Sequence, residues 1–290
     1  MTTASNLARI MGVLVAALAL CACSAVKLGY NNLNEVAYWW MDGYVDFNDA
    51  QAPRVREDLA RLHLWHRSTE LPRVAELLEG MEKLMPGEIA PAQACGFVTQ
   101  LRERLGAVMA QGEPAMVTLA LGLEPEQLAH LERKYRRGNA TYKEEWVDLP
   151  PTEQREKRFK QVLDRSEMVY GKLEEPQRAI VRQQMERSVF DPARNLAERQ
   201  RRQQDLLQTL RKLAGQPIAL AQARQLMQGY LERAQVSPDA AYRRYQEALI
   251  EESCRMFSAA HNSTTAGQRE GAARRLRAYQ RDLRDLVAQR

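Results

Sequence analysis

The sequence lacks the motifs that mark the common catalytic sites. Its 290 residues include only 4 histidines and 4 cysteines. It has no Gly-x-Ser-x-Gly elbow, phosphate-binding glycine loop or His-Glu-x-x-His helix, so the usual signatures of α/β-hydrolases, P-loop nucleotidases and zinc proteases are excluded. The carboxylate pairs Glu144-Glu145 and Glu251-Glu252 would diverge by about 100° on a helix and make poor acid–base partners. The sequence therefore favours a protein that is not an enzyme and needs no cofactor.

Metal-ligating residues are also scarce. His63 and His66 lie three residues apart, but a metal site needs three or four converging ligands, and no third ligand lies nearby in the sequence. The Glu-x-x-His pattern of di-iron bundles is missing, because the residues three before each histidine are Ala60, His63, Gln127 and Ser258. We therefore expect no bound metal, and histidines that are either packed or on the surface.

No apolar run reaches the 20 or so residues that a transmembrane helix needs. The run at 10–20 is instead typical of a secretory signal peptide, since Arg9 precedes it and Leu20-Cys21-Ala22-Cys23-Ser24 follows as a lipobox. The sequence predicts a signal peptide at 1–22 and lipid attachment, with palmitate, at Cys23. An uncleaved anchor and cleavage without lipid are the two alternatives.

The residue after the predicted lipid site indicates the membrane to which the protein is sorted. Ser24 stands where inner-membrane retention usually requires Asp. By resemblance to bacterial lipoproteins in general, this implies a lipid-anchored protein of the outer membrane that faces the periplasm.

Cysteine is rare in the rest of the chain. After Cys23 only Cys95 and Cys254 remain, one pair in a compartment that would be oxidising. Each lies on a predicted apolar helix stripe that we expect to face the core; the companions are Val98, Leu101, Leu105 and Val108 for the first, and Ile250 and Phe257 for the second. The sequence favours a disulfide between Cys95 and Cys254, with two buried free thiols as the alternative.

The net charge of +5 is unevenly distributed. Two basic stretches, 194–212 and 269–290, carry most of the excess arginine. Nucleic-acid binding is one interpretation of such stretches, but the predicted periplasmic address argues against it. Contact with anionic lipid head groups or envelope polymers is an alternative. Solvated faces of long helices are the interpretation we favour.

Alternating β-branched residues, which are typical of strands, are almost absent, so we expect an all-α fold. Asp191-Pro192 and Ser237-Pro238 are expected to start helices, and Pro72 is expected to break or kink one. Short connections predict a single bundle of antiparallel helices after the signal peptide. The expected helices are 31–40, 52–85, 91–111, 114–121, 125–147, 152–172, 175–188, 192–213, 218–235, 238–262 and 265–288.

We divide the chain into the signal peptide at 1–22, a lipidated segment at 23–47 that carries an aromatic motif, and an all-helical domain at 48–290. The aromatic motif, Tyr38–Phe47, is the densest unusual feature after the lipobox. Aromatic side chains suit cores, membrane interfaces and binding sites alike, and all three interpretations stay open here. The candidate binding residues are Trp39, Trp40, Asp42, Tyr44 and Asp46. For the two aspartates beside Gly43, a turn and cap is favoured over a cleft.

The stretches Ser24-Ala-Val-Lys-Leu-Gly-Tyr-Asn-Asn32 and Trp39-Trp-Met-Asp-Gly-Tyr-Val-Asp-Phe47 resemble an uncharacterised proteobacterial lipoprotein family, classified as a domain of unknown function. Further matches are Gln51–Arg56, Glu132–Tyr135, Arg199–Asp205 and His261–Thr265. The resemblance covers nearly all of the chain after the signal peptide. It implies a helical envelope lipoprotein, and it implies no catalytic residues.

A weaker resemblance concerns three helix starts, Leu123–Gln127, Leu173–Gln177 and Thr265–Gln268. They are similar to the Leu-Thr-x-x-Gln motifs of small periplasmic helical chaperones, although two of the three carry Glu in place of Thr. The same spacing forms an ordinary capping box, and capping is the interpretation we favour.

Together these features predict a lipid-anchored scaffold or chaperone-like binder of other envelope proteins. Such a binder should have an apolar groove rimmed by the arginine-rich helices. The alternative is an enzyme of unrecognised type that acts on an envelope polymer. Its signature would be a pocket where Asp42 or Asp46 meets His63 or His66. The sequence does not indicate an oligomeric state.

Overall fold

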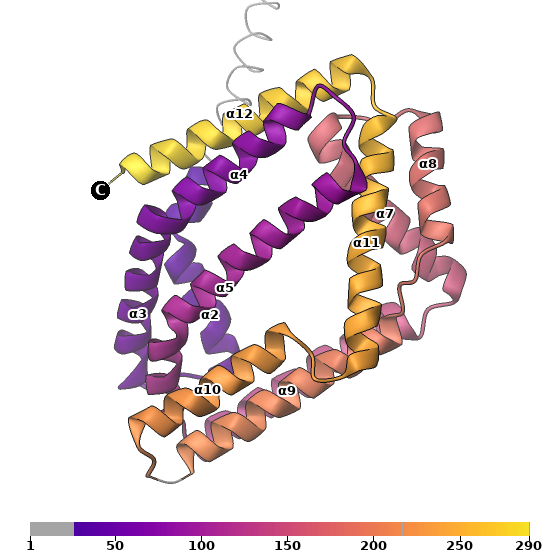
Figure 1. Cartoon of the computed structure of the whole chain (residues 1–290). Coiled ribbons are helices and arrows are strands. Elements are labelled where there is room, and N and C mark those ends of the chain that lie inside the picture. The colour runs from indigo at the N-terminus through magenta and orange to yellow at the C-terminus, as the bar shows by residue number, and fades with distance from the viewer. Residues whose placement is uncertain (1–25, 216, 290) are drawn as a thin grey trace, which may run out of the picture.

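The computed structural model describes residues 26–215 and 217–289, and within them it is all-α with no strand. The predicted fold class is confirmed, whereas Cys23 and the predicted signal peptide lie outside the described residues. Residues 26–31 are helical and lead into the first numbered helix. The elements (Figure 1) are α2 Leu33–Val45, α3 Gln51–Trp65, η1 His66–Glu70, α4 Leu71–Leu84, α5 Pro91–Leu121, α6 Pro125–Tyr142, η2 Lys143–Val147, α7 Pro151–Tyr170, α8 Glu175–Glu186, α9 Pro192–Ala214, α10 Leu220–Gln235, α11 Ala240–Asn262 and α12 Ala266–Ala288.

The long helical stretch expected at 52–85 contains a π-helical turn, η1, just before Pro72. Proline has no N–H to donate to the carbonyl four residues earlier, so the regular ladder cannot continue through this position. The chain responds with one wider turn and then resumes as α4. The break expected at Pro72 is therefore present, and it takes the form of a π-bulge.

The two helices expected at 91–111 and 114–121 are in fact one helix, α5, with Pro114 inside it. Glu113 stabilises this position: its carboxylate is buried and accepts hydrogen bonds from Arg224 of α10, with Nη2 3.0 Å from Oε2. The helix therefore continues because a tertiary contact holds the residues around the proline.

Two hydrophobic clusters lie at opposite ends of α5. The first contains Ala94 of α5 and side chains from the end of α4, α7, α8, α11 and α12, among them Met85, Phe159, Val181, Cys254 and Leu276. The second contains Val117 and Ala120 of α5 and side chains from α6, α9 and α10, among them Leu128, Leu210, Leu213 and Met227. In Figure 1, α5 runs across the molecule from α11 to α10 and so connects the two clusters.

The predicted disulfide between Cys95 and Cys254 is present in the first cluster, with the two Cα atoms 5.4 Å apart. It joins α5 to α11 across 159 residues of chain. Ile250 and Phe257 pack against the same cluster, as expected from the stripe that they share with Cys254.

Glutamines cap several helices, and four of them meet in two reciprocal pairs. Gln127 accepts the backbone N–H of Glu124, and Gln177 accepts that of Glu174, which are the capping boxes expected from the sequence. In addition, the side chains of Gln127 and Gln51 hydrogen-bond each other, at 2.7 and 3.0 Å. Gln177 and Gln268 do the same, at 2.7 and 3.1 Å. Each pair joins the starts of two helices that are distant in the sequence.

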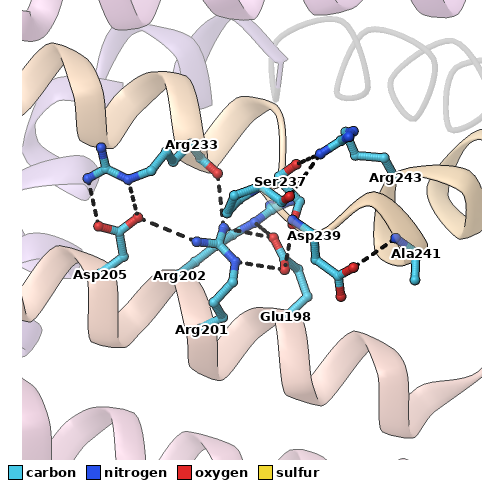
Figure 2. Close-up of polar contacts among 10 residues, drawn as sticks. Glu198, Arg201, Arg202, Asp205, Arg233, Ser237, Asp239, Ala241 and Arg243 are labelled. Carbon is cyan, nitrogen blue, oxygen red and sulfur yellow. Dashed lines mark hydrogen bonds and ion pairs between the residues drawn. The ribbon is translucent and has the colours of Figure 1, made fainter.

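The expected cap at Ser237 is wrong. Asp239 is the N-cap of α11, and its carboxylate accepts the N–H of Ala241. Ser237 is fully buried and its hydroxyl donates to Glu198 Oε2 at 3.0 Å, as Figure 2 shows. The same hydroxyl accepts the backbone N–H of Asp239 at 3.2 Å. Ser237 therefore supplies a donor to the buried carboxylate and supports the turn before α11, but it is not the N-cap.

The basic stretch at 194–212 is engaged in internal ion pairs more than expected of a solvated face. Arg201 and Arg202 both donate to the buried carboxylate of Glu198 (Figure 2). Arg233 of α10 forms a bidentate ion pair with Asp205 of α9, in which Nε and Nη2 donate to the two carboxylate oxygens at 2.9 and 2.8 Å. These charges therefore fix the packing of α9 against α10.

Candidate functional site

Half of the aromatic motif packs inside the hairpin formed by α2 and α3. Tyr38 is buried, and the guanidinium of Arg56 from α3 stacks 3.6 Å from its ring centroid. Arg56 also forms an ion pair with Glu35 on α2. Phe47 lies against Tyr38, and Tyr44 lies against Tyr135 of α6. These aromatic residues fix α2 to α3 and α6, which is the core interpretation of the motif.

The two tryptophans of the motif face outward. Trp39 is 63 % exposed and Trp40 is 65 % exposed. Val36 and Leu33, one and two turns before Trp40, are exposed as well. Apolar side chains on a helix usually turn toward the core, so this face of α2 is available for contact with another surface.

The two aspartates of the motif form the turn that follows α2. A carboxylate oxygen of Asp42 accepts the backbone N–H of Phe47 at 2.9 Å. Asp46 takes the left-handed conformation (φ 61°) that ends the helix. Its exposed carboxylate lies 4.0 Å from Nδ1 of His130 on α6. The predicted capping role of the aspartates is present, but the turn expected at Asp42-Gly43 is wrong, because α2 continues through both residues to Val45 and turns at Asp46.

The two spaced histidines lie at the other end of the hairpin. The hydroxyl of Tyr30 is 2.9 Å from Nδ1 of His66, and its ring packs edge-on against His63. Burial lowers the pKa of both histidines, and burial raises the pKa of Tyr30 to about 12. Neutral, packed histidines result, which is one of the two states expected from the sequence.

The pocket expected for an enzyme does not form among these residues. His63 and His66 lie beside Tyr30. Asp42 follows Tyr30 by twelve residues, which corresponds to about 18 Å along a helix at 1.5 Å per residue. Neither aspartate contacts either histidine. No cluster of metal-ligating side chains occurs among the residues that the structure describes.

The apolar stripe of α5 is only partly buried, and the inward orientation expected for all of it is wrong. Cys95 and Val98 pack against the first cluster, as predicted. Leu101 is 51 % exposed and Leu105 is 58 % exposed. Periodicity identifies residues that share a helix face, but it does not show whether a neighbouring helix covers that face. Among the described residues, no helix does so at Leu101 and Leu105 in the middle of α5.

The neighbours of α5 explain this gap. Its first turns pack against α11, and its last turns pack against α10. The middle of α5 contacts α3, and Arg104 lies 3.7 Å from the buried carboxylate of Glu70 in η1. Figure 1 shows α11 and α10 diverging from the middle of α5.

Residues 43–232 match the family DUF6279, described as a family of unknown function. The chain belongs to this family. The DUF6279 match includes the turn at Asp46, the exposed part of α5 and both members of the pair Gln51–Gln127. It leaves out most of α2 and all of α11 and α12, although the last two complete the first hydrophobic cluster. No curated protein and no solved structure matches the chain.

The sequence left open whether Trp39 and Trp40 are exposed, and it did not connect them with Leu33 and Val36 as one face or predict the reciprocal glutamine pairs. The signal for the face was available, because Leu33, Val36 and Trp40 have the i, i+3, i+7 spacing of one helix side. The reciprocal glutamines had only a weak signal, the repeated capping box. No helix of the described chain is long and apolar enough to span a membrane.

Proposed function

We propose that this protein is a lipoprotein of the bacterial envelope, attached through Cys23 to the outer membrane and facing the periplasm. We further propose that it acts without catalysis, as a scaffold or chaperone-like binder of other envelope proteins. The lipobox supports the anchor, and the disulfide between Cys95 and Cys254 agrees with an oxidising compartment.

The uncovered middle of α5 is the observation that carries the binding role. Leu101 and Leu105 lie side by side on one face, a turn apart, and both are more than half exposed. The neighbouring helices α11 and α10 pack against the first and the last part of α5, at Cys95 and around Glu113 and Val117. An apolar segment of another protein would bury these two leucines and gain about 25 cal/mol for each Å² removed from water.

The described residues give no observation that favours the alternative of an enzyme. Its predicted carboxylates and histidines lie at opposite ends of the α2–α3 hairpin. The capping boxes that resemble chaperone motifs are explained by helix capping and by the glutamine pairs. The binding proposal therefore rests on α5 and not on that resemblance.

The anchor is tested by labelling cells with a palmitate analogue. We expect label on the wild-type protein and none on Cys23→Ala, because the thiol is the predicted site of acylation. Label on both proteins would contradict lipidation at Cys23. Intact mass of the purified protein checks in addition that residues 1–22 have been removed.

The binding role is tested by placing a photocrosslinking amino acid at Leu101 or Leu105 in the full-length protein and irradiating whole cells. We expect adducts with other envelope proteins at these two positions. The matched control is Met168 on α7, which is also apolar and exposed. Equal adducts at all three positions, or none at Leu101 and Leu105, would contradict a binding role for α5.

A further inference from the structure

The solvent-facing side of α2 carries no charge. Across Leu33–Val45 the exposed residues are Leu33, Val36, Trp39, Trp40 and Gly43. Around a helix with 100° per residue, these five positions fall within one side of about 120°. Four of them are large and apolar. The face is therefore a continuous apolar strip three turns long.

The two charged residues of α2 lie beside the strip and not within it. Glu35 is held by Arg56 of α3, and Asp42 caps the following turn by accepting the N–H of Phe47. Soluble helices normally place such carboxylates toward water and apolar groups toward the core. Because this strip exposes large apolar groups, we expect it to meet a non-aqueous surface.

The position of the strip in the chain identifies this surface as a lipid bilayer. Val26, the first described residue, is three positions after Cys23, and these three steps span at most about 11 Å. Val26 and Leu28 are exposed apolar residues that continue toward the anchor. If Cys23 carries acyl chains in the membrane, as proposed above, the helical residues 26–31 that lead into α2 begin near the membrane surface.

The composition of the strip fits the interface between head groups and acyl chains. Tryptophan is enriched there because its ring is apolar and its indole N–H can reach water. Leucine and valine on the same side enter the acyl boundary, as in interfacial helices that lie parallel to the membrane. With about 0.8 kcal/mol per buried methylene, several acyl chains already hold the protein firmly, so the strip would orient the protein instead of anchoring it.

We propose that α2 lies flat on the lipid surface, with Leu33, Val36 and Trp40 in contact with the acyl boundary and Trp39 at the head groups. This contact is a second attachment beside the lipid on Cys23, and it rests on the proposed lipidation. It fixes which side of the molecule faces the membrane, because α2 is tied to α3 and α6 by the packed aromatic residues.

The test uses the full-length lipoprotein, processed in cells and reconstituted in vesicles of phosphatidylethanolamine and phosphatidylglycerol. A spin label is attached to Val36→Cys, and a control label to Leu220→Cys at the start of α10. Both positions are exposed, so the label should leave the fold intact; circular dichroism checks this. Collision with oxygen and with a water-soluble nickel chelate measures the membrane depth of each label.

We expect reconstitution to raise oxygen collisions and to lower nickel collisions several-fold at position 36, with little change at position 220. Nickel access at position 36 equal to that at position 220 would overturn the proposal. Protection accompanied by dipolar broadening between labels, and lost on dilution with unlabelled protein, would overturn it in favour of contact with a second copy.

The acyl mass of the same sample distinguishes a failure of the proposed lipid anchor from a failure of the proposed membrane contact of α2. A protein without acyl mass contradicts the lipid anchor of the proposed function. A protein with acyl mass whose position 36 remains open to nickel contradicts only the interfacial placement of α2.

Discussion

At the scale of single residues, buried polar side chains decide which protonation states the fold accepts. His261 is fully buried in the first cluster, with Nε2 2.8 Å from the carbonyl oxygen of Gly87 and Nδ1 2.9 Å from the hydroxyl of Tyr170. The carbonyl can only accept, so Nε2 carries the proton and Nδ1 accepts from the tyrosine. The neutral imidazole satisfies both partners, and a second proton would displace the hydrogen of Tyr170.

We therefore expect acid to destabilise the protein through His261. Burial lowers the pKa of this imidazole below its ordinary 6.5. The unfolded chain then binds more protons, so the free energy of unfolding falls as pH drops below about 6.5. Urea unfolding at pH 8 and at pH 5.5 measures this loss.

The variant His261→Gln gives the matched comparison. It removes the titrating ring, so its stability should depend less on pH, although His63 and His66 keep part of the dependence. At pH 8 it should cost about 1–3 kcal/mol, because Gly87 or Tyr170 loses its partner. An equal acid loss in both proteins would show that His261 does not contribute.

At the scale of helices, the sequence predicts most of the starts, because caps and prolines act locally. Asp191 accepts the N–H groups of Ala193 and Arg194, as its place before Pro192 predicts. Features that depend on distant contacts were not predictable. The continuity of α5 through Pro114 depends on Arg224, and the outward face of α2 depends on which of its sides α3 and α6 cover. The same limit applies to the candidate site, since exposure is a property of the assembled fold.

The pair Gln177–Gln268 offers a quantitative test of contact between two helix starts. Either single change to alanine leaves the other amide without its reciprocal partner, whereas the double change removes the whole interaction. We expect a coupling energy of about 1 kcal/mol in a double-mutant cycle measured by urea unfolding. The control cycle combines Gln268→Ala with Gln183→Ala, an exposed glutamine on α8. Coupling of the same size in both cycles would contradict a specific pair.

At the scale of the whole molecule, α5 connects two hydrophobic clusters that share few other contacts. The first cluster is closed by the disulfide between Cys95 and Cys254, and the second has no covalent link of its own within the described chain. The helices that complete the first cluster come from both ends of the chain, since α4 packs extensively against α12. The disulfide therefore restrains the part of the molecule with the largest separations in sequence.

This arrangement predicts that reduction loosens one end of the molecule more than the other. A bridge across 159 residues restricts the unfolded chain by an amount worth roughly 4–5 kcal/mol at most. Hydrogen exchange should therefore accelerate after reduction in α11, α12 and the first turns of α5, while α9 and α10 keep most of their protection. Thiol alkylation verifies that both cysteines are free, and Cys95→Ala with Cys254→Ala should reproduce the pattern without reductant. Equal acceleration in α9 and α11 would mean that the two clusters unfold as one unit, because α5 would then transmit the loss of the bridge along its whole length.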